Sequence, residues 1–230
     1  MEKLIYLLGE APPGTIPHSR RDLHDALLGA APALEAAGAQ RVSFGVADVT
    51  DSDAERVPQF NSSGLLDAQL SLWIDCLDER EHIESIVKEL APRMAGYLVT
   101  ESILRDHVRR DWRSGEPCPG IALVTTFPKP RTLDDDTFYA RWQGSHGPLS
   151  LALHPLQRYV RNAVARALTS GAPPIRAIVS ETVASAAIAA DPEQFYGGRG
   201  NRKRAVKDLL SFAELDSMST IVMSETILST

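Results

Sequence analysis

The side chains best suited to acid–base chemistry lie in the second half of this sequence. Phe138, Trp142 and His146 are spaced four residues apart, so on a helix all three would project from one face. The pKa of an imidazole lies near neutrality, and among aromatic rings it needs a hydrogen-bond partner or water. His146 is therefore a candidate acid–base or ligand-orienting residue. The alternatives are a structural histidine bonded to a carbonyl loosened by Gly147–Pro148, and core packing for the two aromatic residues.

Polar residues on the strands that follow could complete a site around His146. Tyr159 could act as a phenolic acid, and Asn162 offers donors and an acceptor for a carbonyl or hydroxyl group. Their odd spacing places them on opposite faces of a strand, so only one can share a cavity with His146. Glu181 could act as a base if burial raises the pKa of its carboxyl group. Structural roles for Tyr159 and Asn162, and a solvated position for Glu181, are the alternatives.

Other motifs predict no further site. His154 precedes Pro155 in a turn that offers nothing to aim its ring, so we expect no function there. The sequence contains no H-x-x-x-H, paired-carboxylate or nucleophile-elbow motif, and Cys76 and Cys118 lack metal-ligand spacing. We therefore expect neither a metal site nor a serine hydrolase. The basic run from Arg199 to Arg204 predicts a solvated helix start rather than an anion site.

Composition narrows the class of protein. The 230 residues are 43% hydrophobic and 23% charged, which excludes a disordered chain, a collagen-like fibre or a disulfide scaffold. The net charge is −6 and the 24 basic residues are mostly scattered, so nucleic acid is not expected as a partner. No apolar run approaches the roughly 18 residues of a membrane span, and two cysteines fit a reducing compartment. We expect a cytoplasmic protein that does not bind membranes.

An internal repeat organises the chain. Residues 94–104 align without gaps on residues 218–228 and share Met, Glu, Ile and Leu at matched positions, so Glu101 corresponds to Glu225. We expect these two carboxylates to be two copies of one structural feature. The repeat predicts a first unit at 1–112, a polar linker at 113–119 and a second unit at 120–230.

Each half shows the order strand, helix, strand, strand, helix, strand. In the first half the strands are predicted at 3–8, 41–49, 69–76 and 96–105, and the helices at 20–37 and 79–93. In the second half the strands are predicted at 120–127, 156–167, 175–184 and 217–228, and the helices at 134–149 and 191–210. This α+β order is typical of a ferredoxin-like βαββαβ unit, whose sheet carries both helices on one face. Two such units would cover their open faces by packing sheet against sheet.

A family resemblance adds to this interpretation. The segment Phe138–Leu149, followed by Leu156–Asn162, resembles the EthD family of the dimeric α/β-barrel superfamily, with its aromatic helix, histidine and Tyr-x-x-Asn strand. The resemblance covers most of 120–228. The first half is degenerate, because Leu23, Leu27 and Ala31 stand where the second half has its aromatic pair and histidine. The resemblance implies two tandem ferredoxin-like units that form one barrel within the chain, with an asymmetric site.

The resemblance also implies the function classes. The first is a cofactor-independent isomerase, cyclase, dehydratase or decarboxylase that acts on a small hydrophobic or aromatic molecule, with His146, Glu181 and Tyr159 as catalytic residues. Phe138, Trp142 and Asn162 would contact the ligand. The second is a non-catalytic binding or accessory protein of a catabolic or biosynthetic pathway, and the third is a haem-binding barrel. A homodimer of the two-unit chain is a further expectation.

Overall fold

The strands close into a barrel. The computed structural model describes residues 1–9, 20–49, 52–61, 64–91 and 93–228. The barrel strands are β1 (Glu2–Gly9), β2 (Gln40–Val46), β4 (Ala68–Ile74), β5 (Arg93–Arg105), β6 (Ile121–Phe127), β7 (Leu156–Ala167), β8 (Ala177–Val183) and β9 (Ser219–Ile227). Their order is β2-β4-β1-β5-β7-β8-β6-β9, and β9 pairs back onto β2. The short β3 (Phe60–Asn61) adds to β9 outside this ring.

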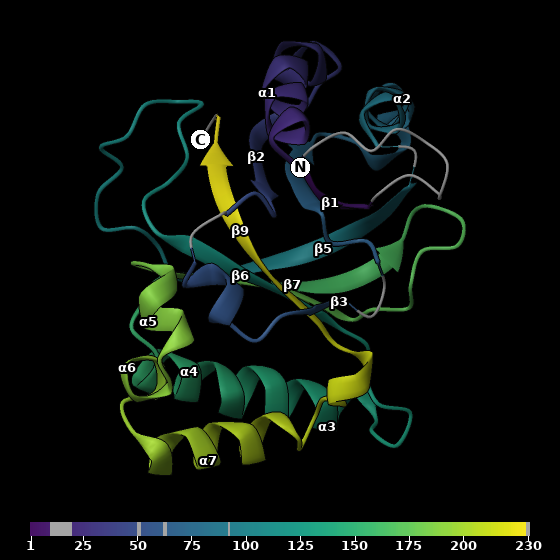
Figure 1. The fold of residues 1–230 in the computed structure, drawn as a ribbon. Helices are drawn as coiled ribbons and strands as arrows, with labels where there is room; N and C mark the ends of the chain where they lie inside the picture. The colour runs from purple at the N-terminus through teal and green to yellow at the C-terminus, as the bar shows by residue number, and fades with distance from the viewer. Residues whose placement is uncertain (10–19, 50–51, 62–63, 92, 229–230) are drawn as a thin grey trace.

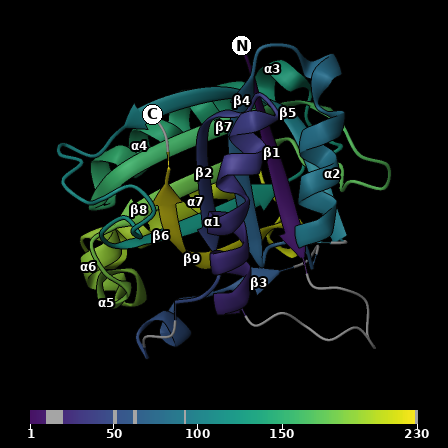
Figure 2. The ribbon, with the colours of Figure 1, turned by 90° about the horizontal axis from the view of Figure 1, so that it is seen from above.

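Helices cover the outside of the barrel on two opposite sides (Figure 1). On the side of the first-half strands lie α1 (Arg20–Ala36) and α2 (Glu81–Leu90), which Figure 2 shows in front of the barrel. On the other side lie α3 (Asp135–Tyr139), α4 (Gly147–Leu153), α5 (Ala186–Ala190), α6 (Pro192–Tyr196) and α7 (Arg199–Leu209). Among the described residues, no helix has both the length and the apolar composition needed to cross a bilayer.

Strand β1 shows why the sequence has continuous apolar runs rather than alternating ones. Leu4 and Tyr6 pack beneath α1 and α2, whereas Ile5 and Leu7 point into the barrel interior with Tyr97. Both faces of the strand are therefore buried. A third core cluster fills the space between the C-terminal strands and helices α3 to α7.

The α+β class is confirmed, and each predicted strand and helix is present with ends shifted by a few residues. Helix α5 was not expected. The barrel that the resemblance implies is present, and its two sheets do more than pack face to face, because hydrogen-bonded ladders join them at both edges. Glu101 pairs with Asn162 between β5 and β7, and Gly45 pairs with Glu225 between β9 and β2. Closure satisfies the edge groups that an open sheet would expose.

The barrel interior holds two ion pairs on related strands. Lys3 Nζ on β1 donates to Glu101 Oε2 on β5, and Arg158 Nη1 on β7 donates to Glu225 Oε1 on β9 at 2.7 Å. Glu101 and Glu225 thus each neutralise a buried cation, which agrees with the expectation that they share a structural role. A buried charge needs such a partner because removal from water is costly.

The predicted helix at 134–149 is present but contains an unusual turn. Asp134 begins it as an N-cap, since its side chain accepts a hydrogen bond from the Thr137 N–H at 2.6 Å. Between α3 and α4 the chain is a π-helix over Ala140–His146. Wide turns of this kind occur frequently at functional sites.

The proline after this segment leaves one carbonyl of the wide turn without a backbone donor. The Gly147 N–H donates to the Trp142 carbonyl five residues earlier, so the next donor in the series would be the nitrogen of Pro148. Proline has no N–H, and the Gln143 carbonyl is left without a backbone donor. Arg161 Nη1 on β7 donates to it at 3.0 Å. The loosened carbonyl is therefore satisfied by the neighbouring strand.

Candidate functional site

A cavity of about 480 Å³ lies between the outer face of the C-terminal strands and the helices that cover them. Strands β6 and β8 supply its floor, and the π-helical segment, α6 and α7 supply its opposite wall. Residues of the first half also reach it, with Arg56, Val57, Pro58 and Phe60 along one side. The cavity thus belongs mainly to the second half, where the sequence places its candidate residues.

Aromatic rings make up much of the lining. Phe127 on β6 contacts Trp142 at 5.4 Å and Phe212 at 5.7 Å between ring centroids. Phe195 on α6 and the neighbouring Tyr196 line the far side. Aromatic faces of this kind are suited to packing against a flat, apolar ring system.

His154 is held in the cavity lining by two neighbours. It follows α4 directly, and its ring stacks on Phe195 with centroids 4.2 Å apart. Its Nδ1 lies 3.6 Å from Oε1 of Glu181 on β8, and its side chain is only 7% exposed. Neither ring nitrogen has a hydrogen-bond partner among the described residues. The expectation that nothing aims this ring is wrong, because the fold brings α6 and β8 against it.

Glu181 differs from the sequence expectation in its charge state. Burial acts to raise the pKa of its carboxyl group, but attraction to His154, and to a smaller extent to His146, outweighs burial and lowers the pKa. The expectation of a raised pKa is therefore wrong. Glu181 is therefore an ionised carboxylate that can stabilise a positive charge on a nearby imidazole.

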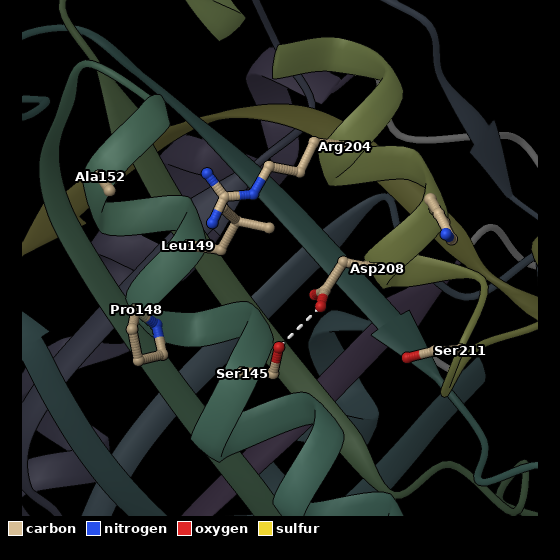
Figure 3. A pocket seen from close by; sticks show the side chains of 8 residues that line it. Ser145, Pro148, Leu149, Ala152, Arg204, Asp208 and Ser211 are labelled. Carbon is tan, nitrogen blue, oxygen red and sulfur yellow. Dashed lines mark hydrogen bonds between the residues drawn. The ribbon is translucent and has the colours of Figure 1, made fainter. Parts of the chain in front are cut away.

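His146 also has a carboxylate partner. Its Nδ1 lies 2.8 Å from Oδ2 of Asp208 on α7, and its ring packs edge-on against Phe212 at 5.0 Å. Ser145 Oγ donates to the other Asp208 oxygen at 2.7 Å, as Figure 3 shows. The alternative in which His146 bonds the loosened carbonyl does not hold, because Arg161 occupies that carbonyl.

Tyr159 and Asn162 lie on different faces of β7. Tyr159 lines the cavity, where burial and the negative charge of Glu181 both raise the pKa of its phenol. Tyr159 therefore keeps its proton and can donate a hydrogen bond. Asn162 is buried but does not line this cavity, and its Nδ2 donates to the Ile178 carbonyl at 3.2 Å.

Of the two aromatic residues of the predicted site, only one lines the cavity. Trp142 lines the cavity, whereas Phe138 is fully buried behind it, with ring centroids 5.6 Å apart. The ligand-contact roles of Phe138 and Asn162 remain predictions, and the described cavity does not include either residue. Asp208 was not found from the sequence, since nothing local marks a single acid on a basic helix as the partner of a histidine.

A second groove lies on the outer side of the same helices, between α4 and α7 (Figure 3). Its rim carries two basic residues of α7, Arg204 and Lys207, and its floor includes Leu149 and Pro148. Asp208 lines this groove and also contacts His146, which lines the cavity. Asp208 therefore lies between the groove and the cavity.

Comparison with known proteins identifies the fold. No protein-family model and no curated protein matches the chain. A solved anthrone oxidase-like protein is similar in structure, with a TM-score of 0.59 and 10% identity over 100% of this chain and 93% of that chain. The chain has a dimeric α/β-barrel fold. A chlorite dismutase-like protein aligns over 100% of this chain and 96% of its own, with 11% identity and a TM-score of 0.45.

Proposed function

We propose that this protein binds a small, flat, hydrophobic molecule in the ring-lined cavity and moves a proton on it without a bound cofactor. One observation carries the proposal. His154 is buried in the cavity lining, its Nδ1 faces the Glu181 carboxylate, and its ring nitrogens have no hydrogen-bond partner among the described residues. A buried imidazole in this state is available to a ligand.

The pair His154 and Glu181 suits proton abstraction. With the proton of neutral His154 on Nδ1, towards Glu181, the lone pair of Nε2 is free to accept a proton from an acidic C–H or O–H group. The imidazolium that forms is stabilised by the ionised carboxylate beside it. Return of the proton to another atom of the ligand completes an isomerisation, and its return after bond cleavage completes a lyase reaction. Positioned general acid–base catalysis of this kind contributes about 10²–10⁴-fold.

Two further residues would receive the charge that develops on the ligand. Tyr159 remains a neutral phenol, so its hydroxyl can donate to an oxygen that becomes negative. His146 is fixed through Nδ1 by Asp208, which leaves its Nε2 to contact the same ligand. We assign orientation and charge stabilisation to His146 and Tyr159, with Trp142 packing against the ring system.

The aromatic lining suggests the class of ligand. A structural neighbour is described as anthrone oxidase-like, and anthrone is a fused-ring ketone with an acidic ring CH₂ group. The cavity volume of about 480 Å³ lies in the range of pockets that hold small molecules. We infer that hydroxylated or keto polycyclic aromatic compounds fit this site, and anthrone is a suitable first probe.

Deuterium exchange tests the proposal without knowledge of the full reaction. Anthrone is incubated with the protein in D₂O without oxygen, and deuterium at its CH₂ group is followed by NMR. Catalysed exchange above that of the heat-denatured protein is expected. Saturable binding without catalysed exchange would favour the alternative of a non-catalytic binding protein. A Soret band after incubation with haem would favour the haem-binding alternative.

We also propose that the chain is an EthD-like protein made of two ferredoxin-like units, 1–112 and 120–230, joined by 113–119. The strand orders support the two-unit arrangement, and the EthD-like assignment rests on the segment Phe138–Leu149. Read from its last strand, the first half runs β5-β1-β4-β2 and the second half runs β9-β6-β8-β7. Both halves therefore place their fourth, first, third and second strands side by side in that order. A cytoplasmic location and a homodimer of this chain remain predictions.

A further inference from the structure

A second group of reactive side chains lies at one end of the barrel, outside the cavity lining. His107 follows β5, Cys118 precedes β6, and Glu225 lies in β9. One nitrogen of the histidine, the sulfur of the cysteine and one carboxylate oxygen lie within 4.8 Å of one another. Three segments that are distant in sequence thus bring together a nitrogen, a sulfur and an oxygen donor.

Two of the three donor atoms of this cluster have no other hydrogen-bond partner among the described residues. His107 Nε2 and Glu225 Oε2 are buried and have no hydrogen-bond partner among the described residues. Cys118 is buried as well, whereas Cys76, the other cysteine, is exposed. A buried polar group without a hydrogen-bond partner is unfavourable. The cluster therefore needs something to occupy the space between its three donors.

The surroundings hold the donors in place. Arg158 Nη1 donates to Glu225 Oε1 at 2.7 Å, which leaves the other carboxylate oxygen, Oε2, without a partner among the described residues. The Cys118 backbone N–H donates to the Glu225 carbonyl at 2.6 Å, and the His107 ring packs edge-on against Trp112 at 4.9 Å. Contacts of this kind orient metal ligands in proteins. The positive charge of Arg158 is shared with Asp106, whose Oδ1 lies 3.3 Å from Arg158 Nε.

We propose that His107, Cys118 and Glu225 bind a zinc-type divalent ion. Imidazole, thiolate and carboxylate are ligands that Zn²⁺ accepts in a tetrahedral site, with water at the fourth position. Zn–ligand bonds of about 2.0–2.3 Å would require each donor to move inwards by less than about 1 Å. The ion would tie both ends of the connection between β5 and β6 to β9, and so clamp the segment that joins the two halves.

Binding would release the proton of the buried Cys118 thiol, because a thiol that coordinates a divalent cation is deprotonated.

Cobalt(II) tests this site, because sulfur ligation gives Co²⁺ a charge-transfer absorption that zinc lacks. The chelator-treated full-length protein is titrated with Co²⁺, and then with Zn²⁺ to displace it. We expect a sulfur-to-cobalt band at one equivalent that zinc abolishes. The band should be lost in Cys118→Ser and retained in the matched control Cys76→Ser.

A second variant guards against misfolding of Cys118→Ser. His107→Gln alters a loop residue whose Nε2 has no hydrogen-bond partner among the described residues, so we expect its circular dichroism spectrum to match the wild type. Its Kd for Co²⁺ should rise by at least about tenfold. Failure of the wild type to give the band, loss of the band in Cys76→Ser, or unchanged affinity in folded His107→Gln would each overturn the proposal. The cavity contains none of these residues, so failure here leaves the proposed proton transfer intact.

Discussion

The Nδ1 atom of His154 lies 3.6 Å from Oε1 of Glu181, with the imidazole 7% and the carboxylate 16% exposed. His154 follows the end of α4 and Glu181 lies in β8, and Phe195 stacks on the imidazole ring. This relationship makes the carboxylate the partner of the imidazole and leaves the second ring nitrogen to a ligand.

Removal of the Glu181 charge should weaken proton transfer and change the acid stability of the protein. Because the folded-state pKa of Glu181 lies below its ordinary value, the carboxylate stabilises the fold above the unfolded pKa of about 4.5. That contribution is lost as the pH falls through the folded pKa. Glu181→Gln should therefore show a smaller fall in Tm than the wild type between pH 6 and pH 3, relative to its own value at pH 6. Parallel Tm curves would contradict the lowered pKa.

The buried pair in the barrel interior should behave as a unit. Lys3→Met leaves the Glu101 carboxylate without its cation, so we expect a loss of about 3–5 kcal/mol in the free energy of unfolding. Lys3→Met combined with Glu101→Leu removes both charges and should recover most of that loss. Urea denaturation of the two single variants and the double variant gives the coupling energy. Additive losses would show that the two side chains do not interact.

Substitutions at Phe138 and Phe195 should differ in whether they lower ligand affinity as well as stability. Phe138→Leu removes part of a ring that is buried outside the cavity lining, so we expect a loss of about 1–2 kcal/mol with the Kd for anthrone unchanged. Phe195→Leu alters the lining and removes the ring stacked on His154, so ligand affinity should fall. Urea denaturation and fluorescence titration give both quantities. Equal effects of both variants on the Kd would place Phe138 in the site, as its helical spacing first indicates.

Arg161 should maintain the π-helical turn that carries His146. In Arg161→Met the Gln143 carbonyl loses its donor, because Pro148 cannot supply one, and we expect a loss of about 1–3 kcal/mol. The exposed Arg166 on the same strand provides the matched control, and Arg166→Met should stay within about 0.5 kcal/mol of the wild type. If both variants have the same stability, the contact at Gln143 does not support the turn.

Local patterns predicted the elements, whereas the closure of the barrel was implied only by the family resemblance. Apolar runs and the helical spacing of Phe138, Trp142 and His146 are signals carried by neighbouring residues, and the structure contains the elements they indicate. Edge pairing such as that of Glu101 with Asn162 depends on two strands that are distant in sequence. Nothing in either strand marks its partner.

The site shows the same limit. The helical spacing of Trp142 and His146 led to a cavity that both residues line, since spacing along a helix is local information. The place of His154 in the sequence led to a wrong expectation for its ring. The residue precedes Pro155 in a turn, but in the fold its ring lies against Phe195 and Glu181. Asp208 could not be found for the same reason, since it reaches His146 from a separate helix.

The most direct test of the central claim compares His154→Gln with His146→Gln in the anthrone exchange experiment. We expect His154→Gln to lose about 10²-fold or more of the catalysed deuterium exchange while its Kd for anthrone and its Tm stay near those of the wild type. His146→Gln should weaken binding and retain measurable catalysed exchange. Undiminished exchange in folded His154→Gln, with exchange abolished in His146→Gln, would contradict the assignment and return the proton transfer to His146.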